Sequence, residues 1–297
     1  MIDIAICICT RNRQDGLKKL LDSLMKMQAP LDTKIRIVVV ENDSKNFSED
    51  IVNGFALKSK IKTNYFLEPR QGLAFARNRT VYDAGKCDFC CFVDDDQVVS
   101  PDWLVELVKC QLEYDADGVW GPNPPIFNGS VPSYIREFHM PEMYDYGTIV
   151  RFGYTNCLLL RKSYLDRIDG PFDLRLNFTG GEDNYLTWHI TNLGGIIRYN
   201  PNAIAYELIP QSRATIRYVI KRTYKNSNTG LFLKSLIEKK SSWNKFPRLV
   251  LRFCFGVVIA IPFLVFGKSN KLIGLKKIAN ALGGFMFILG SKNNFYN

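Results

Sequence analysis

The chain has 297 residues, of which 46% are apolar and 23% are charged. This globular composition gives enough length for one large or two smaller domains with a substantial core. The first residues, MIDIAICICT, carry an acid and no basic cluster, which argues against a secretory signal peptide. The net charge of +10 is uneven, because 211–297 hold 16 Lys and Arg and one acid, whereas 1–210 hold 23 and 28. We therefore expect an acidic front part that carries chemistry and a basic tail that attaches to an anionic surface.

Alternating apolar runs and helical patterns predict an α/β domain with a mostly parallel sheet. The leucines at 17, 20, 21 and 24 form one helical stripe after Asp15. A second helix is predicted over 72–84, and a third after Ser100-Pro101. We expect the proline-rich segment 122–150 to be an irregular loop on the acceptor side. Buried strands are predicted over 2–9 and 35–40, a short third strand over 64–67 and a fourth strand over 89–93.

Eight cysteines are present, and most of them lie in these apolar runs. Their spacing gives no disulfide framework, so we expect reduced, buried thiols in a cytosolic domain. Cys87 and Cys90 form a C-x-x-C pair, but a second Cys/His pair is missing from the sequence, which argues against a zinc site.

Three consecutive acids, Asp94, Asp95 and Asp96, directly follow the strand 89–93. Neighbouring carboxylates repel one another, so their charge must be compensated by solvent, a basic partner or a bound cation. Ligands of open α/β sheets bind beyond the carboxyl ends of the strands. Oxygen ligands favour Mg²⁺ or Mn²⁺, and alternate residues of an extended chain point the same way. We predict that Asp94 and Asp96 hold the metal while Asp95 faces elsewhere; the alternative is a solvated acidic loop.

Polar clusters also follow the other predicted strands, at 10–13, 41–44 and 68–70. We expect all of them to meet the aspartates at one edge of the sheet.

Six segments, in this order, resemble the family 2 glycosyltransferases. The resemblance implies a GT-A fold, which is a Rossmann-like, mostly parallel sheet flanked by helices. It also implies sugar transfer from a nucleotide-diphosphate-sugar donor with Mn²⁺ or Mg²⁺, usually with inversion. The segments are CTRNR (9–13), VVVENDSKN (38–46), EPRQGLAFARNRT (68–80), FVDDDQVVSPDWL (92–104), YTNCLLLRKSYL (154–165) and FDLRLNFTGGEDNYL (172–186).

The resemblance also implies roles for individual residues. Asp183, in the first turn of a helix after Gly180-Gly181, is the implied general base, with Glu182 as the second choice. Glu41 stands where the family often has an aspartate, which leaves the base preference open. Two alternatives remain: Arg77 could be a surface charge, and Asn156 could bond a buried backbone group. His189 is expected to be uncoordinated rather than a third metal ligand. The implied nucleotide-sugar contacts are Thr10, Arg11, Glu41, Gly72, Arg77, Asp94, Asp95 and Asn156.

The tail 211–297 contains two uncharged stretches, 253–267 and 278–290. As helices each would reach about 20 Å, short of a hydrocarbon core of about 30 Å. Lys and Arg border both stretches, which favours peripheral or re-entrant association with an anionic membrane on its cytoplasmic face. The alternative is a soluble helical subdomain packed on the catalytic domain, 1–210. Nucleic acid is not expected, because aromatic, apolar stretches favour lipid.

We therefore expect an inverting glycosyltransferase that acts on a lipid-linked saccharide or a growing polysaccharide. One alternative is a nucleotidyltransferase of related α/β layout, although the loop CTRNRQDG lacks the glycine-rich, lysine-containing pattern of that class. Another alternative is a glycoside hydrolase, which also uses two carboxylates. The last is a non-catalytic membrane-binding protein with a disabled transferase domain.

Overall fold

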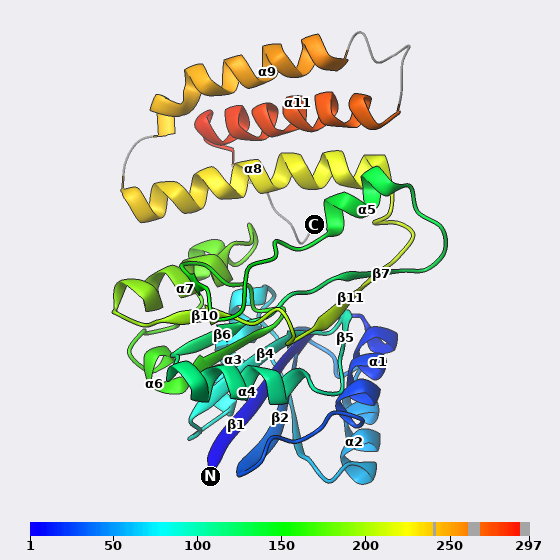
Figure 1. Ribbon diagram of the computed structural model, residues 1–297, viewed down its shortest axis with the longest axis vertical. Helices are drawn as coiled ribbons and strands as arrows, with labels where there is room; N and C mark the ends of the chain where they lie inside the picture. Colours follow the sequence, from blue (N-terminus) through cyan, green and yellow to red (C-terminus); the bar gives the residue numbers. More distant parts are fainter. Residues whose placement is uncertain (240–241, 261–267, 292–297) are drawn as a thin grey trace. The chain divides into compact units, whose positions relative to one another are not determined.

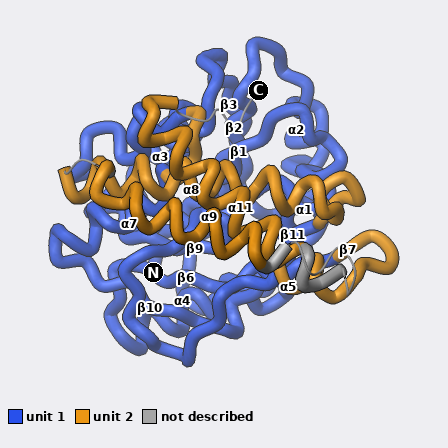
Figure 2. The backbone as a smooth tube through the Cα atoms, turned by 90° about the horizontal axis from the view of Figure 1, so that it is seen from above, with its two compact units in different colours: residues 1–126, 140–177, 182–208 blue, residues 127–139, 178–181, 209–297 orange. Residues whose placement is uncertain are grey.

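The computed structural model describes residues 1–239, 242–260 and 268–291 (Figure 1). Part of the predicted uncharged stretch 253–267 thus lies outside the described residues. The chain divides into two compact units (Figure 2). The first contains 1–126, 140–177 and 182–208, and the second contains 127–139, 178–181 and 209–297.

The first unit is built on an eight-stranded sheet of order β3-β2-β1-β4-β9-β6-β10-β8. The pairs β2–β3, β1–β2, β1–β4 and β6–β10 are parallel, whereas β9 runs antiparallel to β4 and β6, and β8 to β10. The predicted mostly parallel α/β fold is confirmed. The strands are β1 (Ile2–Thr10), β2 (Thr33–Glu41), β3 (Lys62–Leu67), β4 (Phe89–Asp94), β6 (Gly118–Trp120), β8 (Ile149–Val150), β9 (Leu158–Arg161) and β10 (Ile197–Tyr199).

Alternate side chains of β1 enter two different cores, one on each face of the sheet. Ile4, Ile6 and Ile8 pack with buried residues of α1, α2 and α4. Ala5 and Cys7 pack with residues of α3 and α7 on the other face. A strand buried on both faces explains why its sequence is an almost continuous apolar run. The helices of this unit are α1 (Gln14–Leu24), α2 (Glu49–Lys58), α3 (Leu73–Asp83), α4 (Trp103–Tyr114), α6 (Lys162–Leu165) and α7 (Glu182–Asn192), with the 3-10 helix η1 (Leu174–Leu176).

The segment 122–150 differs from the predicted irregular loop. It contains β7 (Pro125–Phe127) and α5 (Ser133–His139) before β8. Ile135 of this helix is buried with Val219, a residue of the same second unit that lies far along the chain. A smaller sheet has the order β5-β11-β7, with β5 (Gln97–Val99) antiparallel to β11 (Ala205–Ile209).

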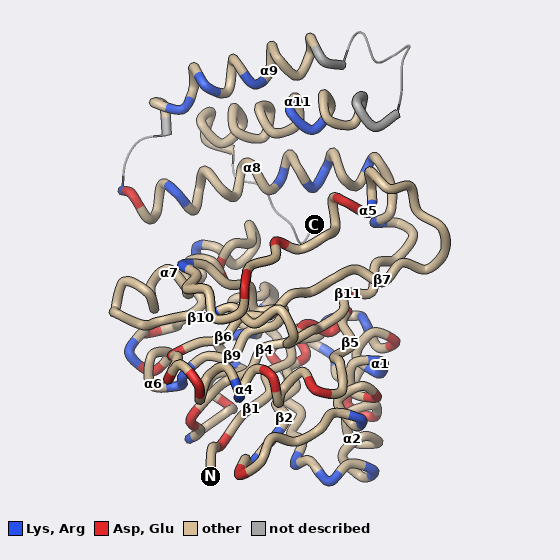
Figure 3. The backbone as a smooth tube through the Cα atoms, in the orientation of Figure 1, with Lys and Arg blue, Asp and Glu red and all other residues tan. Residues whose placement is uncertain are grey.

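The second unit contains the long helices α8 (Ile216–Glu238), α9 (Phe246–Ala260) and α11 (Lys268–Ile288), with the short η2 (Ser242–Lys245). Helix α11 approaches α8 closely at Gly283, whose carbonyl accepts a 3.2 Å hydrogen bond from Asn228 Nδ2. Lys and Arg recur along these helices (Figure 3), and Glu238 is the single acid in 211–297. Among the described residues, no helix combines the length and hydropathy needed to cross a membrane.

Candidate active site

The polar strand ends of the first unit lie along one edge of the sheet, as predicted. The register pairs Thr10 with Glu41 between β1 and β2, and Cys9 with Asp94 between β1 and β4. The end of β2 in turn lies beside Leu67 of β3. The aspartates at the end of β4 therefore share an edge with the three other polar clusters.

The middle aspartate of the triplet faces the loop after β1. Asp95 is 4% exposed, and it accepts hydrogen bonds from Thr10 Oγ1 at 2.9 Å and Arg13 Nη1 at 2.8 Å. Burial raises the pKa of Asp95 to about 6, although both of these donors oppose the rise. Arg13 also bonds Asp96, at 2.9 Å. Asp95 thus serves the fold of this loop, while the side chain of Asp94 stays 37% exposed.

Arg77 is a buried residue of α3, so the alternative of a surface charge is wrong. Its Nη1 donates to Glu182 of α7, and its Nη2 lies 3.3 Å from Asp94 Oδ1. Against the cost of burial, the charges of Glu182 and Asp94 raise the pKa of Arg77 above its ordinary value. One guanidinium therefore joins the aspartate motif to the acidic start of α7.

The two acids at the start of α7 differ in their surroundings. Glu182 is 3% exposed, and its Oε2 is buried without a hydrogen-bond partner among the described residues. Burial, assisted by the charge of Asp183, raises the pKa of Glu182 to about 7 against the pull of Arg77. Asp183 is only half-buried and lies in the first turn, as predicted. Of the two side chains, that of Asp183 is the more exposed.

The carboxylates of Asp96 and Asp183 lie close enough to Asp94 to affect its ionisation. Burial and then the charges of Asp96 and Asp183 raise the pKa of Asp94, while Arg77 lowers it. A divalent cation would relieve this repulsion, and oxygen ligands suit Mn²⁺ or Mg²⁺. Among the described residues, no three His, Cys, Asp or Glu side chains are grouped as a complete metal cage. Magnesium sites in proteins often use one or two carboxylates, with substrate phosphates completing the coordination.

His189 lies apart from this group of acids. Its ring contacts Tyr185 and Trp188, with centroids 4.9 and 5.1 Å away, and burial lowers its pKa. The expectation that His189 is uncoordinated stays a prediction.

Glu41 is placed inside the fold rather than at its surface. It is fully buried and accepts hydrogen bonds from Ser48 N at 2.8 Å, Ser48 Oγ at 3.2 Å and Tyr65 Oη at 2.6 Å. These contacts hold the start of α2, and a direct role with the nucleobase stays a prediction. Arg11 lies nearby at the same edge, with its Nε 3.7 Å from Asp43 Oδ2.

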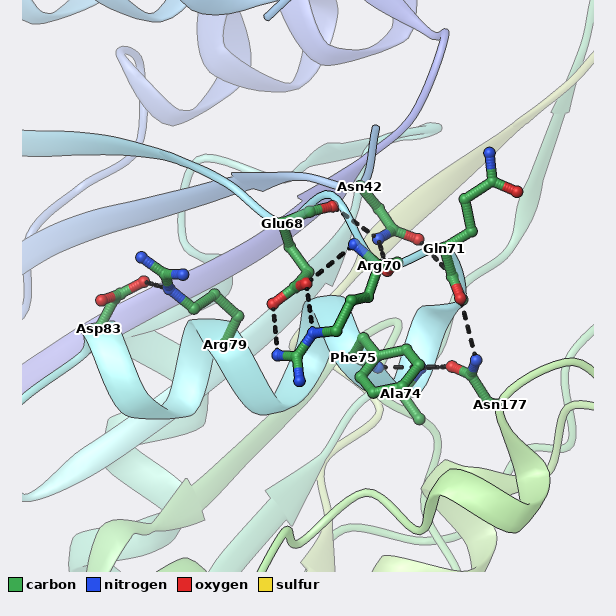
Figure 4. Close-up of polar contacts among 10 residues, drawn as sticks. Asn42, Glu68, Arg70, Gln71, Ala74, Phe75, Arg79, Asp83 and Asn177 are labelled. Atoms are coloured by element: carbon green, nitrogen blue, oxygen red, sulfur yellow. Dashed lines mark hydrogen bonds and ion pairs between the residues drawn. The ribbon is translucent and has the colours of Figure 1, made fainter. Parts of the chain in front are cut away.

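The loop before α3 is held by two asparagines that the sequence did not single out, Asn42 and Asn177 (Figure 4). Gly72 lies between them and has φ of +129°, a conformation that favours glycine. Asn177 is 105 positions from Gly72, so no local pattern signals the contact. Asn156 lies in the turn before β9 rather than on the strand, and its Oδ1 is buried without a partner in the described part of the chain.

The carboxylates and the arginine gather beyond the carboxyl ends of the strands, where open α/β sheets bind their ligands. The family model described as glycosyl transferase family 2 matches residues 5–169, which is more than half of the chain. The chain belongs to this family and is a glycosyltransferase of the GT-A fold. The nucleotidyltransferase and hydrolase alternatives are thereby set aside.

Individual relatives agree with this class. The succinoglycan biosynthesis protein ExoM of Rhizobium meliloti (strain 1021) is 29% identical over 247 residues, which cover 82% of this chain and 79% of ExoM. The mannosyltransferase PcManGT from Pyrobaculum calidifontis, solved with GDP-Man and Mn²⁺, superimposes with a TM-score of 0.67 at 13% identity, covering 98% of this chain and 88% of its own. S. aureus TarS 1–349 in complex with UDP gives a TM-score of 0.56 at 16% identity, covering 100% and 93%. At these identities the two structures show a shared fold.

Proposed function

We propose that this glycosyltransferase moves a sugar, with inversion, from a nucleotide-diphosphate donor to a saccharide acceptor. The observation that carries the proposal is the convergence of Asp94, Glu182 and Asp183 on Arg77, because the end of β4, the start of α7 and α3 are three separate segments of the chain. The proposal assigns Asp94 and Asp96 to the donor side and Asp183 to the acceptor side.

In the proposed step, an acceptor hydroxyl attacks the anomeric carbon from the face opposite the leaving group. The new C–O bond forms as the bond to the diphosphate oxygen breaks, and the nucleoside diphosphate leaves with the electron pair. Asp183 receives the hydroxyl proton, which requires an accessible carboxylate within reach of the attacking oxygen. Arg77 keeps Glu182 and Asp94 in place during the step.

Asp94 and Asp96 are the residues that would hold Mn²⁺ or Mg²⁺. When bound, the ion would supply Lewis-acid stabilisation of the negative charge on the leaving diphosphate. Support for a metal comes from the mutual effect of the neighbouring carboxylates on the pKa of Asp94, and from the Mn²⁺ in the complex of PcManGT. The remaining proposed contacts of the donor are Thr10, Arg11, Gly72 and Asn156. Asp95 positions the loop after β1 through its hydrogen bond with Thr10.

For the acceptor, we propose a lipid-linked saccharide or a growing polysaccharide. ExoM is named for succinoglycan biosynthesis, which supports a polysaccharide product. Helix α9 supports a membrane-held acceptor, because Leu251, Phe255 and Val258 are exposed on one face, 70%, 55% and 63% respectively. Exposed Arg248 and Arg252 border this face. An apolar helical face with a basic rim suits the cytoplasmic surface of an anionic membrane, as a peripheral attachment.

The test is a transfer assay on the full chain with UDP-Glc, UDP-GlcNAc and GDP-Man, each with Mn²⁺ or Mg²⁺, and a polyprenyl-linked saccharide as acceptor. Proton NMR of the product gives the anomeric configuration. We expect a divalent-dependent product of inverted configuration with one of these donors. A product of retained configuration would overturn the assignment of Asp183 as the general base. Transfer that persists unchanged in EDTA would overturn the assignment of Asp94 and Asp96 to a metal.

A further inference from the structure

The loop Glu68–Gly72, between β3 and α3, has its backbone held by the side chain of Asn42. Asn42 Nδ2 donates to the carbonyls of Glu68 at 3.1 Å and Arg70 at 2.7 Å, and Asn42 Oδ1 accepts from Gly72 N at 2.8 Å. The Glu68 carboxylate accepts from Arg70 N at 3.0 Å. Three backbone groups of this short loop thus bond Asn42 on the side of β2, and a fourth bonds a side chain of the loop itself.

The same loop is held from its other side by Asn177, which is 3% exposed. Asn177 Nδ2 donates to Gln71 O at 3.1 Å, and its Oδ1 accepts from Ala74 N at 3.0 Å and Phe75 N at 3.4 Å. These last two groups are orphan donors of the first turn of α3. Asn177 therefore fastens the loop and caps the helix with one amide (Figure 4).

The fit around Gly72 is tight. A Cβ at this position would lie 1.8 Å from Asn177 Nδ2 and 2.1 Å from Asn177 Oδ1. The amide thus occupies the space that any larger residue at position 72 would need. The side chain of Gln71, which is exposed, points away from both asparagines (Figure 4). The inward side of the loop is hydrogen-bonded to both asparagines, and Gln71 on its outward side is exposed.

We infer that Asn177 is a positioning residue that fixes the donor-binding loop Glu68–Gly72 from the segment that leads to Asp183. The inference rests on the proposed function, because it takes this edge of the sheet as the donor site. Asn177 lies six residues before Asp183 and contacts the loop at the carboxyl end of β3. Loss of its amide leaves the loop held from the Asn42 side alone, so the donor must restrict the loop further when it binds, which weakens donor affinity.

Two substitutions separate loop fixation from helix capping. Asn177→Ala removes both functions, whereas Asn177→Asp keeps an oxygen for Ala74 N but turns a second oxygen toward Gln71 O. Asp is also a favourable capping residue at a helix N-terminus. The matched control is Asn78→Ala on α3. Asn78 bonds Phe172 N at 2.9 Å and Phe172 O at 2.8 Å, so it joins α3 to the same segment without touching the loop.

The experiment measures hydrogen exchange of residues 70–76 in the ligand-free chain, the Kd for UDP and GDP with Mn²⁺, the thermal midpoint, and donor KM and kcat. We expect both Asn177 variants to raise exchange of the loop and to raise donor Kd and KM about tenfold, with kcat within about twofold. Asn177→Asp should retain a higher midpoint than Asn177→Ala. Asn78→Ala should lower the midpoint and leave donor Kd unchanged.

Wild-type donor affinity in both Asn177 variants would overturn the inference. A donor Kd that rises in step with the fall of the thermal midpoint in Asn177→Ala, Asn177→Asp and Asn78→Ala would also overturn it, because the effect would then come from lost stability alone. Failure of the proposed function is distinguishable, since the wild-type chain itself would then bind neither nucleotide and transfer no sugar. That result would remove the donor role of the loop as well.

Discussion

Arg77 on α3 and Glu182 on α7 form an ion pair across 105 positions of the chain, and their side chains are 6% and 3% exposed. The same guanidinium contacts Asp94, so one positive charge attracts acids at both the end of β4 and the start of α7. A buried pair of this kind contributes little net stability when it is complete, but it is costly to break.

Replacing Arg77 by Met should therefore lower the free energy of unfolding by about 3–5 kcal/mol, because two partly or fully buried acids lose their cation. The matched control is Arg79→Met on the same helix. Arg79 pairs with Asp83 within this one helix and its side chain is 35% exposed, so its loss should cost less than the loss of Arg77. Urea unfolding followed by circular dichroism measures both values. Equal effects of the two substitutions would show that the buried contact has no special weight.

Asp183→Asn should reduce the turnover of sugar transfer by about 10²–10⁴-fold, the usual contribution of a general base. Donor affinity should stay close to that of the wild type, since Asp183 is assigned to the acceptor. Asp166→Asn is the control, because Asp166 is an exposed acid paired with Lys162. Isothermal titration with the nucleotide and initial transfer rates test the separation. An Asp183→Asn enzyme with wild-type turnover would require another base.

Asp96→Asn should abolish the stabilisation that Mn²⁺ gives together with a nucleoside diphosphate. A ligand at 100 times its Kd adds about 2.7 kcal/mol to the stability of a wild-type protein. Thermal shift with UDP or GDP, recorded with Mn²⁺ and again after EDTA, measures this contribution. A variant that keeps the full Mn²⁺-dependent shift would place the cation elsewhere.

The stability of the loop before α3 should depend on pH through Glu68. The hydrogen bond from Arg70 holds the pKa of Glu68 below its ordinary value of 4.5, and it outweighs the opposing effect of burial. A depressed pKa in the folded state gives stability that is present above the unfolded pKa and is lost as pH falls through the folded one. Glu68→Gln should therefore lower the thermal midpoint at pH 7, and the difference from the wild type should shrink below pH 4.5. A constant difference from pH 7 to pH 3 would contradict this account.

Membrane attachment should depend on the exposed apolar face of α9. Leu251→Ser with Phe255→Ser should weaken binding to phosphatidylglycerol vesicles at least about tenfold, since burial of such side chains contributes about 1.5–3 kcal/mol each. Leu31→Ser with Leu57→Ser is the control, because these leucines of the first unit are 93% and 90% exposed. Vesicle flotation at low and high salt measures both effects. Equal flotation of the two double variants would exclude α9 as the contact.

The sequence predicts what depends on neighbouring residues. The order of strands and helices, the shared edge of the polar strand ends and the place of Asp183 in a first turn all follow from local periodicity and capping, and the structure has them. Helix α2 was not predicted. Its buried residues are few, Val52 and Phe55, so its stripe is weak.

Contacts between distant segments could not be predicted in this way. The capping of α3 by Asn177 and the bridge from Arg77 to Glu182 each span more than a hundred residues, and no spacing in the chain indicates them. Likewise, the sequence does not indicate that Ser48 donates a hydrogen bond to the carboxylate of Glu41.

The inward orientation of Glu41 has a consequence for engineering donor preference. Because its oxygens are bonded to Ser48 and Tyr65, a mutant library at position 41 would mostly yield misfolded second helices rather than altered nucleobase choice. Libraries at Arg11, Asp43 and Gln71 would instead vary side chains at the edge of the site and leave the hydrogen bonds of Glu41 intact.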